Sequence, residues 1–353
     1  MINWVPNKRV NTHYINQCIS KCEETNVFTN GGQFVKQLEK ETASLLKIDI
    51  QNKAVIVVVN ASVGLQILTS SLSYYYNKEI KWCTQSFTFP PSAQGTLSKA
   101  KILDIDLEGG LDINKVDVDN IDGIIVTNIF GNCVDIKKYI EWSKKYKKYL
   151  IFDNAATPYT FYQDSNVNNY GHGSVISFHH TKPLGFGEGG AIIVDKQYEV
   201  YIRKLINFGI NLIDEYFTRE GINGKMSEIS AIYILSYLKS NFNNIVEKHQ
   251  QLYNYLQIRL SDLNLKEKGI NLFPSFHTTN NFFPSCFCFL IDNFSEEIIN
   301  KFNEKQIFCR KYYEPLKSTH NTMKIYNKIL CLPCTKDMTL NDVDNILNVL
   351  TTL

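Results

Sequence analysis

The sequence predicts an α/β protein, with a large domain built on a central, mostly parallel sheet and a smaller α+β domain at the C-terminal end. Short apolar runs alternate with amphipathic stretches over the first two thirds of the 353 residues, a pattern typical of a sheet covered by helices on both faces. A long helical stretch, roughly 227–260, then leads into a tail of mixed strands and helices. We therefore expect one domain over residues 1–240 and a second over residues 241–353.

The strands expected in the large domain are short apolar runs, as the buried strands of parallel sheets usually are. They cover residues 55–59, 80–84, 101–105, 123–127, 149–153, 175–178 and 191–195. The helices between them repeat Ile, Leu, Val and Tyr every three or four positions and cover residues 33–46, 62–75, 136–147 and 198–208. The smaller domain should hold strands at 287–292 and 329–332 and helices at 296–305 and 340–350.

Composition and charge exclude several classes of function. The chain is 44% hydrophobic with a formal net charge of +2, which gives no electrostatic reason to expect nucleic acid or an anionic membrane as a partner. It has neither an apolar signal core at the N-terminus nor a run of apolar residues long enough to span a membrane, so we expect a cytoplasmic protein.

The nine scattered cysteines predict reduced, mostly buried thiols in a reducing compartment. Cys331 and Cys334 have the spacing of a redox pair, but a single pair without a second one is weak evidence. Ordinary cysteines at a strand edge are the favoured interpretation, and we expect no metal site.

The segment 174–195 presents Lys182 in a short loop between two apolar strands. A buried, unpaired ammonium group is costly, and a lowered pKa or a covalent imine removes that cost. An exposed lysine at a loop tip is the alternative, and this segment alone leaves both interpretations open. The glycines at 185–190 match the dinucleotide pattern G-x-G-x-x-G, but a strand follows them where that motif requires a helix, so we do not expect nicotinamide binding.

Three further segments place reactive or aromatic side chains just after expected strands. Asp153 would cap a helix or would keep the pyridine nitrogen of a pyridoxal cofactor protonated. Asn60 begins a helix whose first turn holds Ala61 and Ser62, where free N–H groups, the helix dipole and a hydroxyl favour a phosphate. Phe89 would join the core or stack on a cofactor ring.

Taken together, these segments resemble the DegT/DnrJ/EryC1/StrS family, which comprises nucleotide-sugar aminotransferases of the aspartate-aminotransferase (fold type I) superfamily. The family pattern S-F-x-x-x-K…G-E-G-G stands here as Ser177-Phe178…Lys182 and Gly187–Gly190. Further similar stretches lie at 28–39, 129–135, 221–231, 310–315 and 332–333, so the resemblance covers almost the whole chain. The chain departs from the family pattern at Ala61-Ser62 (usually Gly-Thr), Ala156 (often His or Gln) and Lys225 (usually Arg).

The resemblance implies an aspartate-aminotransferase-like fold with pyridoxal 5′-phosphate as cofactor. Lys182 would form the covalent bond to the cofactor and shuttle the proton, Asp153 would pair with the pyridine nitrogen, and Phe89 would stack on the ring. The residues that the resemblance assigns to the cofactor phosphate are Ala61, Ser62, Ser177 and Asn223. Because active sites in this family form across a homodimer, Asn223 would reach the phosphate of the neighbouring subunit.

The sequence around Asp153 and Lys182 looks closest to enzymes that aminate C4 of dTDP-4-keto-6-deoxyglucose with L-glutamate to give dTDP-viosamine. Lys225 and Arg310 are the candidates for binding the sugar diphosphate. The 3-aminotransferases and the UDP-sugar 4-aminotransferases share every cofactor residue and stay open as alternatives. Sugar 3-dehydratases carry His at the position of Lys182, and a non-catalytic binding protein would not be expected to keep Lys182, Asp153 and Ser177 together.

Overall fold

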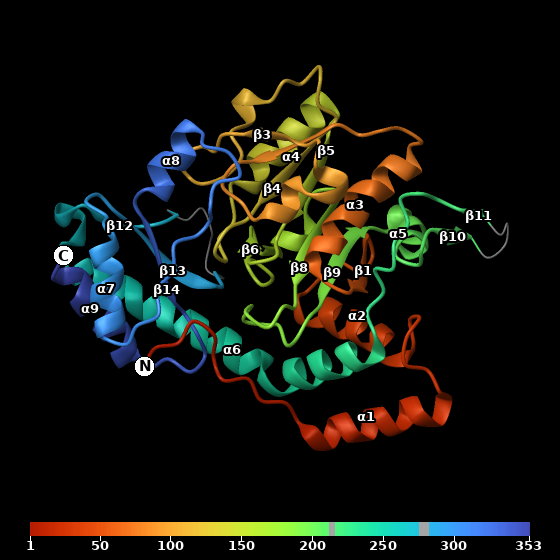
Figure 1. Ribbon diagram of the computed structural model, residues 1–353, viewed down its shortest axis with the longest axis horizontal. Coiled ribbons are helices and arrows are strands. Elements are labelled where there is room, and N and C mark those ends of the chain that lie inside the picture. Colours follow the sequence, from red (N-terminus) through yellow and green to blue (C-terminus); the bar gives the residue numbers. More distant parts are fainter. Residues whose placement is uncertain (212–215, 275–281) are drawn as a thin grey trace.

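A seven-stranded sheet forms the centre of the large domain in the computed structural model, which describes residues 1–211, 216–274 and 282–353 (Figure 1). The order across the sheet is β1, β9, β8, β5, β4, β2, β3. These strands are β1 Lys53–Val58, β2 Trp82–Gln85, β3 Lys101–Leu103, β4 Gly123–Thr127, β5 Tyr149–Asp153, β8 Gly173–Ser177 and β9 Gly190–Asp195. Every neighbouring pair is parallel except the two that contain β9.

Helices cover both faces of this sheet because its buried strands are apolar on both sides. Along β1, Val55 and Val57 face a core that α1 (Thr12–Thr25), α2 (Gln33–Leu45) and α6 (Glu228–Asp262) complete. The alternating Ile56 and Val58 face α3 (Ala61–Tyr75) and α5 (Glu199–Leu205) on the opposite side. Nearer the other edge of the sheet, α4 (Ile136–Tyr146) packs on β4 and β5.

The smaller domain is an antiparallel sheet of β12, β13 and β14 with helices packed against it, seen beside the large domain in Figure 1. Its elements are β12 Ile270–Leu272, β13 Cys286–Ile291, α7 Glu296–Glu304, α8 His320–Tyr326, β14 Ile329–Pro333 and α9 Leu340–Thr351. The helix α6 contributes Val246 to the core of the large domain and Leu252 to that of the smaller one. The domain boundary at residue 240 stays a prediction, and α6 runs unbroken through that position.

The N-terminal segment before α1 spans the two domains. Ile2 pairs with Ile307 and packs in the core of the smaller domain, while Asn11 caps α1, which lies against α6 (Figure 1). Between these two ends, the side chain of Lys8 contacts the loop that carries Lys182. This short, non-helical segment therefore joins both halves of the molecule.

The α/β class, the mostly parallel sheet and the expected strands are confirmed; β4 and β5 have the expected bounds, and the ends of the other strands shift by at most two residues. The sequence did not predict α1, α8, the three-residue strand β12 or the two-residue strand pairs β6–β7 (Phe161–Tyr162, Ser165–Asn166) and β10–β11 (Ile210–Asn211, Tyr216–Phe217). The strand pairs are too short to show any periodicity. In the described part of the chain, no helix combines the length and apolar character needed to cross a bilayer.

Candidate active site

A cavity of about 560 Å³ opens at the carboxyl ends of β4, β5 and β8, where parallel sheets commonly bind ligands. The smaller domain and the N-terminal segment close its other side. The residues of the large domain that line the cavity include Asn60, Ala61, Ser62, Phe89, Thr127, Asp153, Ser177 and Lys182. From the rest of the chain the lining includes Trp4, Ser285, Cys286, Arg310, Tyr312 and Tyr313.

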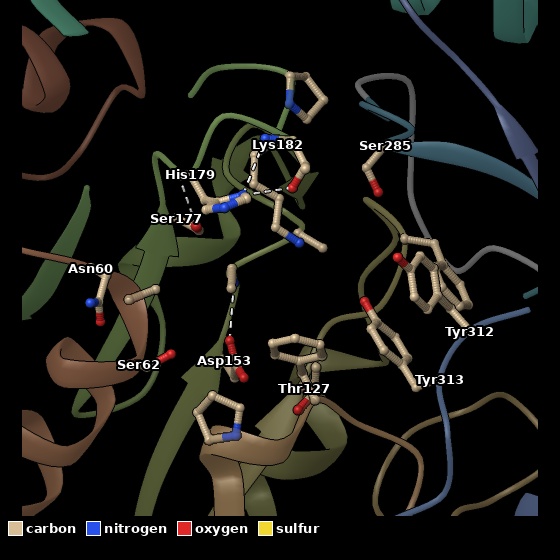
Figure 2. A pocket seen from close by; sticks show the side chains of 18 of the residues that line it. Asn60, Ser62, Thr127, Asp153, Ser177, His179, Lys182, Ser285, Tyr312 and Tyr313 are labelled. Atoms are coloured by element: carbon tan, nitrogen blue, oxygen red, sulfur yellow. Dashed lines mark hydrogen bonds between the residues drawn. The ribbon is translucent and has the colours of Figure 1, made fainter. Parts of the chain in front are cut away.

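A tightly wound loop between β8 and β9 delivers Lys182 to this cavity. The Lys182 amide donates to the His179 carbonyl at 2.8 Å, and the Gly185 amide donates to the Lys182 carbonyl at 3.0 Å. A β-carbon on Gly185 would lie only 2.1 Å from the His179 carbonyl oxygen, so the winding of the loop requires glycine there. The lysine is therefore not an exposed loop tip: its side chain extends towards Asp153, as Figure 2 shows.

Lys182 and Asp153 influence each other electrostatically inside the cavity. Burial lowers the pKa of Lys182, and the negative charge of Asp153 opposes that shift. Burial likewise raises the pKa of Asp153, against the Ala155 amide, the charge of Lys182 and the hydroxyl of Ser92. The carboxylate accepts hydrogen bonds from the Ala155 amide at 3.1 Å and from the Ser92 hydroxyl at 3.3 Å.

The first turn of α3 forms the wall of the cavity on the side of β1. Asn60 caps this helix by accepting a hydrogen bond from the Val63 amide at 2.9 Å, which leaves the amides of Ala61 and Ser62 without an intrahelical partner. A β-carbon on Gly190 would lie 2.5 Å from the Ala61 nitrogen, so β9 can pass this close to the helix only with glycine there. Ser62 and Ser177 both lie on this side of Asp153 (Figure 2).

Aromatic rings form the opposite wall. Tyr313 stacks on Phe130 with ring centroids 5.1 Å apart, and Phe89 meets Tyr313 edge-on at 6.4 Å. Phe89 is 56% exposed, so it faces the open cavity rather than the core. Its side chain is thus available to a flat ligand lying above Asp153.

Arg310 reaches the cavity from the smaller domain between two aromatic rings. Its guanidinium lies 5.2 Å from the ring centre of Trp4 and 5.6 Å from that of Tyr312, and it donates a hydrogen bond to the Tyr312 hydroxyl. Cation–π contacts of this kind hold a guanidinium in one orientation. Arg310 therefore offers a preorganised positive charge at the cavity wall.

Asn223 and Lys225 lie outside this cavity. Asn223 is exposed and pairs with Asn207, while the Lys225 ammonium donates to the Asn207 side chain at 2.6 Å and lies 4.2 Å from the centre of the Phe208 ring. Burial lowers the pKa of Lys225. The structure thus brings together seven of the nine residues expected in the site and leaves these two at the surface near β10.

Sequence reasoning missed the contribution of the N-terminal segment. Trp4 lines the cavity, and the Lys8 ammonium donates to the Lys182 carbonyl at 2.6 Å and to the Gly185 carbonyl. Lys8 also lies 4.9 Å from the centre of the Tyr237 ring on α6. No local pattern marks these residues, because their roles come from contacts with positions more than 170 residues away.

The sequence matches the model of the DegT/DnrJ/EryC1/StrS aminotransferase family over residues 10–351. It is 25% identical to a dTDP-4-amino-4,6-dideoxy-D-glucose transaminase from Shigella dysenteriae, over 92% of this chain and 91% of that protein. It is 24% identical to a UDP-4-amino-4,6-dideoxy-N-acetyl-beta-L-altrosamine transaminase from Campylobacter jejuni, over 88% and 87% of the two chains.

Similarity to solved structures supports the fold. A putative PLP-dependent aminotransferase from Bacillus cereus superposes with a TM-score of 0.84 at 22% identity, covering 99% of each chain. The expected fold type I arrangement, with its mostly parallel central sheet, is thereby confirmed.

The contact between Lys8 and the Lys182 loop predicts a specific pH dependence of stability. Burial, together with the charge of Lys336, lowers the pKa of Lys8 from 10.5 to about 7. Between these values the folded protein binds fewer protons at Lys8 than the unfolded chain, so this residue makes the free energy of unfolding rise with pH. Below pH 7 the residue is charged in both states and contributes no slope.

We expect the melting temperature of the wild type, relative to that of Lys8→Met, to increase between pH 7 and pH 9. Thermal unfolding followed by circular dichroism at both pH values measures this difference. Lys21→Met, an exposed substitution on α1, is the control and should show a constant offset from the wild type. An offset for Lys8→Met that does not change with pH would contradict the lowered pKa of Lys8.

Proposed function

The chain belongs to the DegT/DnrJ/EryC1/StrS aminotransferase family, and from that premise we propose that it transfers the amino group of L-glutamate to a nucleotide-linked keto sugar. Its cofactor is pyridoxal 5′-phosphate. The observation that carries the proposal is the cavity in which the buried amine of Lys182 faces the buried carboxylate of Asp153 beside the first turn of α3. Each of these groups matches a separate part of this cofactor.

The residues around the cavity fit the cofactor. In the described part of the chain, the hydrogen bonds to the Asp153 carboxylate come from neutral donors, so a protonated ring nitrogen would supply the cationic donor that a buried carboxylate favours. Ala155 and Ala156 leave space beside it for a flat ring, and Phe89 would cover the other face of that ring. The phosphate would be held by the α3 terminus at Ala61 and Ser62 and by Ser177.

When bound, the cofactor supplies an electron sink that eases removal of a proton next to the amino group. Asp153 makes that sink effective by keeping the ring nitrogen protonated. Lys182 holds the cofactor covalently and carries the proton from one carbon to another. The burial that lowers the pKa of Lys182 favours its neutral amine, which is the form that accepts a proton.

Among keto sugars, we propose dTDP-4-keto-6-deoxyglucose, with dTDP-4-amino-4,6-dideoxyglucose (dTDP-viosamine) as the product. The relative from Shigella dysenteriae carries that sugar in its name, and the one from Campylobacter jejuni a UDP-linked 4-amino sugar. Amination at C3, or of a UDP-linked sugar, is therefore the alternative. A lysine rather than a histidine at position 182 favours transamination over sugar dehydration.

Arg310 and Lys225 are the cations that we propose for binding the nucleotide diphosphate. Arg310 lines the cavity and is held between two aromatic rings. Lys225 lies outside the cavity of its own chain, so it would serve the site of a neighbouring subunit. Planar, bidentate donors such as Arg310 are well suited to phosphate oxygens.

We also propose a homodimer in which Asn223 reaches the cofactor phosphate of the other subunit. Asn223 is exposed, and the surface around it shows apolar side chains: Phe208, Ile210 and Ile222 are 49%, 39% and 39% exposed. A cluster of exposed apolar residues is typical of a protein interface. The nine free cysteines favour a reducing compartment, and we propose the cytoplasm.

The covalent role of Lys182 can be tested by chemical reduction. Borohydride treatment of the holoenzyme should fix the cofactor to the peptide that contains Lys182, as measured by peptide mass mapping. Lys182→Ala should lower turnover by at least about 10³-fold, since no other group would move the proton. Lys144→Ala, on α4, serves as the control and should behave like the wild type. A label on a different lysine would exclude the mechanism.

The role of Asp153 predicts that Asp153→Asn binds the cofactor but turns over at least about 10²-fold more slowly, because a neutral ring is a poor electron sink. Cofactor content, from absorbance of the dialysed protein, separates loss of binding from loss of rate. The matched control is Asp164→Asn in an exposed turn, which should leave turnover unchanged. Near-normal activity of Asp153→Asn would show that the assignment is wrong.

The shared site predicts that the protein is at least a dimer, and that a monomer binds the cofactor poorly. Analytical ultracentrifugation of the holoenzyme across a dilution series, with cofactor absorbance as the signal, measures both properties together. Asn223→Ala should weaken cofactor retention without changing the sedimentation coefficient. A fully active monomer would refute the proposal.

The substrate is tested by a panel of dTDP- and UDP-linked 4-keto and 3-keto sugars, each with L-glutamate, reading the product mass and the position of the new amine. Because both half-reactions use one site in turn, initial-rate plots should be parallel. Arg310→Ala and Lys225→Ala should raise KM for the sugar nucleotide about 10- to 100-fold and leave KM for glutamate nearly unchanged. Arg9→Ala, which removes an exposed arginine that does not line the cavity, is the control and should leave both KM values unchanged. A preference for a UDP-linked or 3-keto sugar would leave the aminotransferase reaction standing and exclude the dTDP-viosamine proposal.

A further inference from the structure

Three thiols that the proposed reaction does not use meet beside the cavity. Cys286 and Cys288 alternate with Phe287 along β13, so their side chains point to the same face of the sheet. Cys331 lies opposite Cys288 on the neighbouring strand β14. The Sγ atoms of Cys286 and Cys288 are 3.5 Å apart, those of Cys288 and Cys331 are 3.4 Å apart, and all three lie within 4.8 Å of one another.

The pairing of the two strands brings these side chains close. The Cys331 amide donates to the Arg310 carbonyl at 2.8 Å, and the Cys331 carbonyl accepts from the Arg310 amide at 2.9 Å. Both backbone groups of Cys331 therefore point away from β13, which makes Cys288 and Cys331 a non-hydrogen-bonded pair of the two strands. Side chains approach each other most closely in pairs of this type. The backbone therefore holds the three sulfur atoms together.

This arrangement differs from the cysteine pair that the sequence suggested. Cys334, the other cysteine of the 331–334 stretch, is directed towards His249, with its sulfur 3.6 Å from Nδ1. Cys331 instead joins two cysteines that lie more than 40 positions earlier in the chain. The interpretation of Cys331 and Cys334 as ordinary strand-edge cysteines therefore accounts for Cys334 but leaves Cys331 in an unassigned cluster.

We propose that Cys286, Cys288 and Cys331 form a binding site for a thiophilic divalent cation of the Zn²⁺ class. Sulfur ligands around tetrahedral zinc lie about 3.8 Å apart, given Zn–S bonds of about 2.3 Å. The spacings of 3.4 and 3.5 Å lie a few tenths of an ångström below that value, so a small outward movement of the side chains would admit the ion. The three thiols release their protons to solvent as they bind the ion, and three protein ligands leave a fourth position open. Cys286 lines the cavity, so the ion enters from that side and its open position faces the cavity.

The site is coupled to the proposed aminotransferase reaction, on which this part of the inference rests. The Cys286 thiol and the Lys182 amine line the same cavity and interact electrostatically. A cation held by the thiols presents its open coordination position to the cavity that the Lys182 amine also lines, and an amine nitrogen can occupy that position. A bound ion therefore withdraws the amine from the cofactor, and metal occupancy and turnover exclude each other.

Cadmium is a suitable probe of the site, because thiolate-to-cadmium charge transfer absorbs in the ultraviolet and reports binding without any need for activity. Titration of the holoenzyme with Cd²⁺ should give a band that saturates at one equivalent per chain. Cys288→Ala and Cys331→Ala each remove one ligand and should weaken this binding at least about 100-fold. The control is Cys83→Ala, which removes a buried thiol from β2 in the large domain and should leave the titration unchanged.

The melting temperature of each variant, measured without metal, establishes that the variants are folded. A missing band in the wild type, or a band that both Cys288→Ala and Cys331→Ala keep at full affinity, overturns the site. One equivalent of Cd²⁺ should also reduce turnover of the wild type at least tenfold but leave Cys331→Ala at its metal-free rate. Binding without loss of turnover overturns the coupling to Lys182, whereas a wild type that binds Cd²⁺ but never aminates a keto sugar contradicts the proposed function alone.

Discussion

The enclosure of the Lys182 amine and the Asp153 carboxyl group in one cavity is the constraint on which the rest of the site depends. An ammonium or a carboxylate taken alone into a protein interior is unstable, so each of these groups relies on the other or on a ligand between them. Burial shifts the pKa of both towards the neutral form, while the charge of the partner opposes the shift. A cationic ring nitrogen beside Asp153 and a covalent bond to Lys182 would relieve both costs together, which favours the proposed cofactor.

The sheet topology is what allows these two groups to meet. Because β9 is antiparallel to β8, the connection between them stays at the carboxyl edge of the sheet, directly beside the end of β5 that carries Asp153. On its other side β9 pairs with β1, which brings Gly190 against the first turn of α3. One antiparallel strand thus positions both the Lys182 loop and the proposed phosphate seat.

The parts of this arrangement that the sequence predicted are those with a local signature. The apolar strands, the lysine between two of them and the glycines after it are each visible within about 20 residues, so they predicted β8, β9 and the loop between them, but not whether Lys182 is buried. Asn223 and Lys225 fall in a stretch similar to a family motif, in which Lys225 replaces the usual arginine, yet in a single chain both lie outside the cavity. The roles that we propose for them depend on a second subunit, which the sequence of one chain does not place. Lys8, Trp4 and the pairing of Cys288 with Cys331 depend on contacts between distant segments, for which the sequence holds no periodic signal.

The residues proposed to act on the cofactor and those proposed to bind the sugar nucleotide come from different parts of the chain. The residues proposed to act on the cofactor, Lys182 and Asp153, belong to the large domain, and they suit any substrate that the cofactor can aminate. Arg310 and Ser285 come from the smaller domain, and Trp4 from the N-terminal segment that joins it to the Lys182 loop. This second wall is therefore where we expect the residues that select the sugar nucleotide. Relatives named for dTDP- and UDP-linked sugars are 25% and 24% identical to the chain, so their names alone do not decide its substrate.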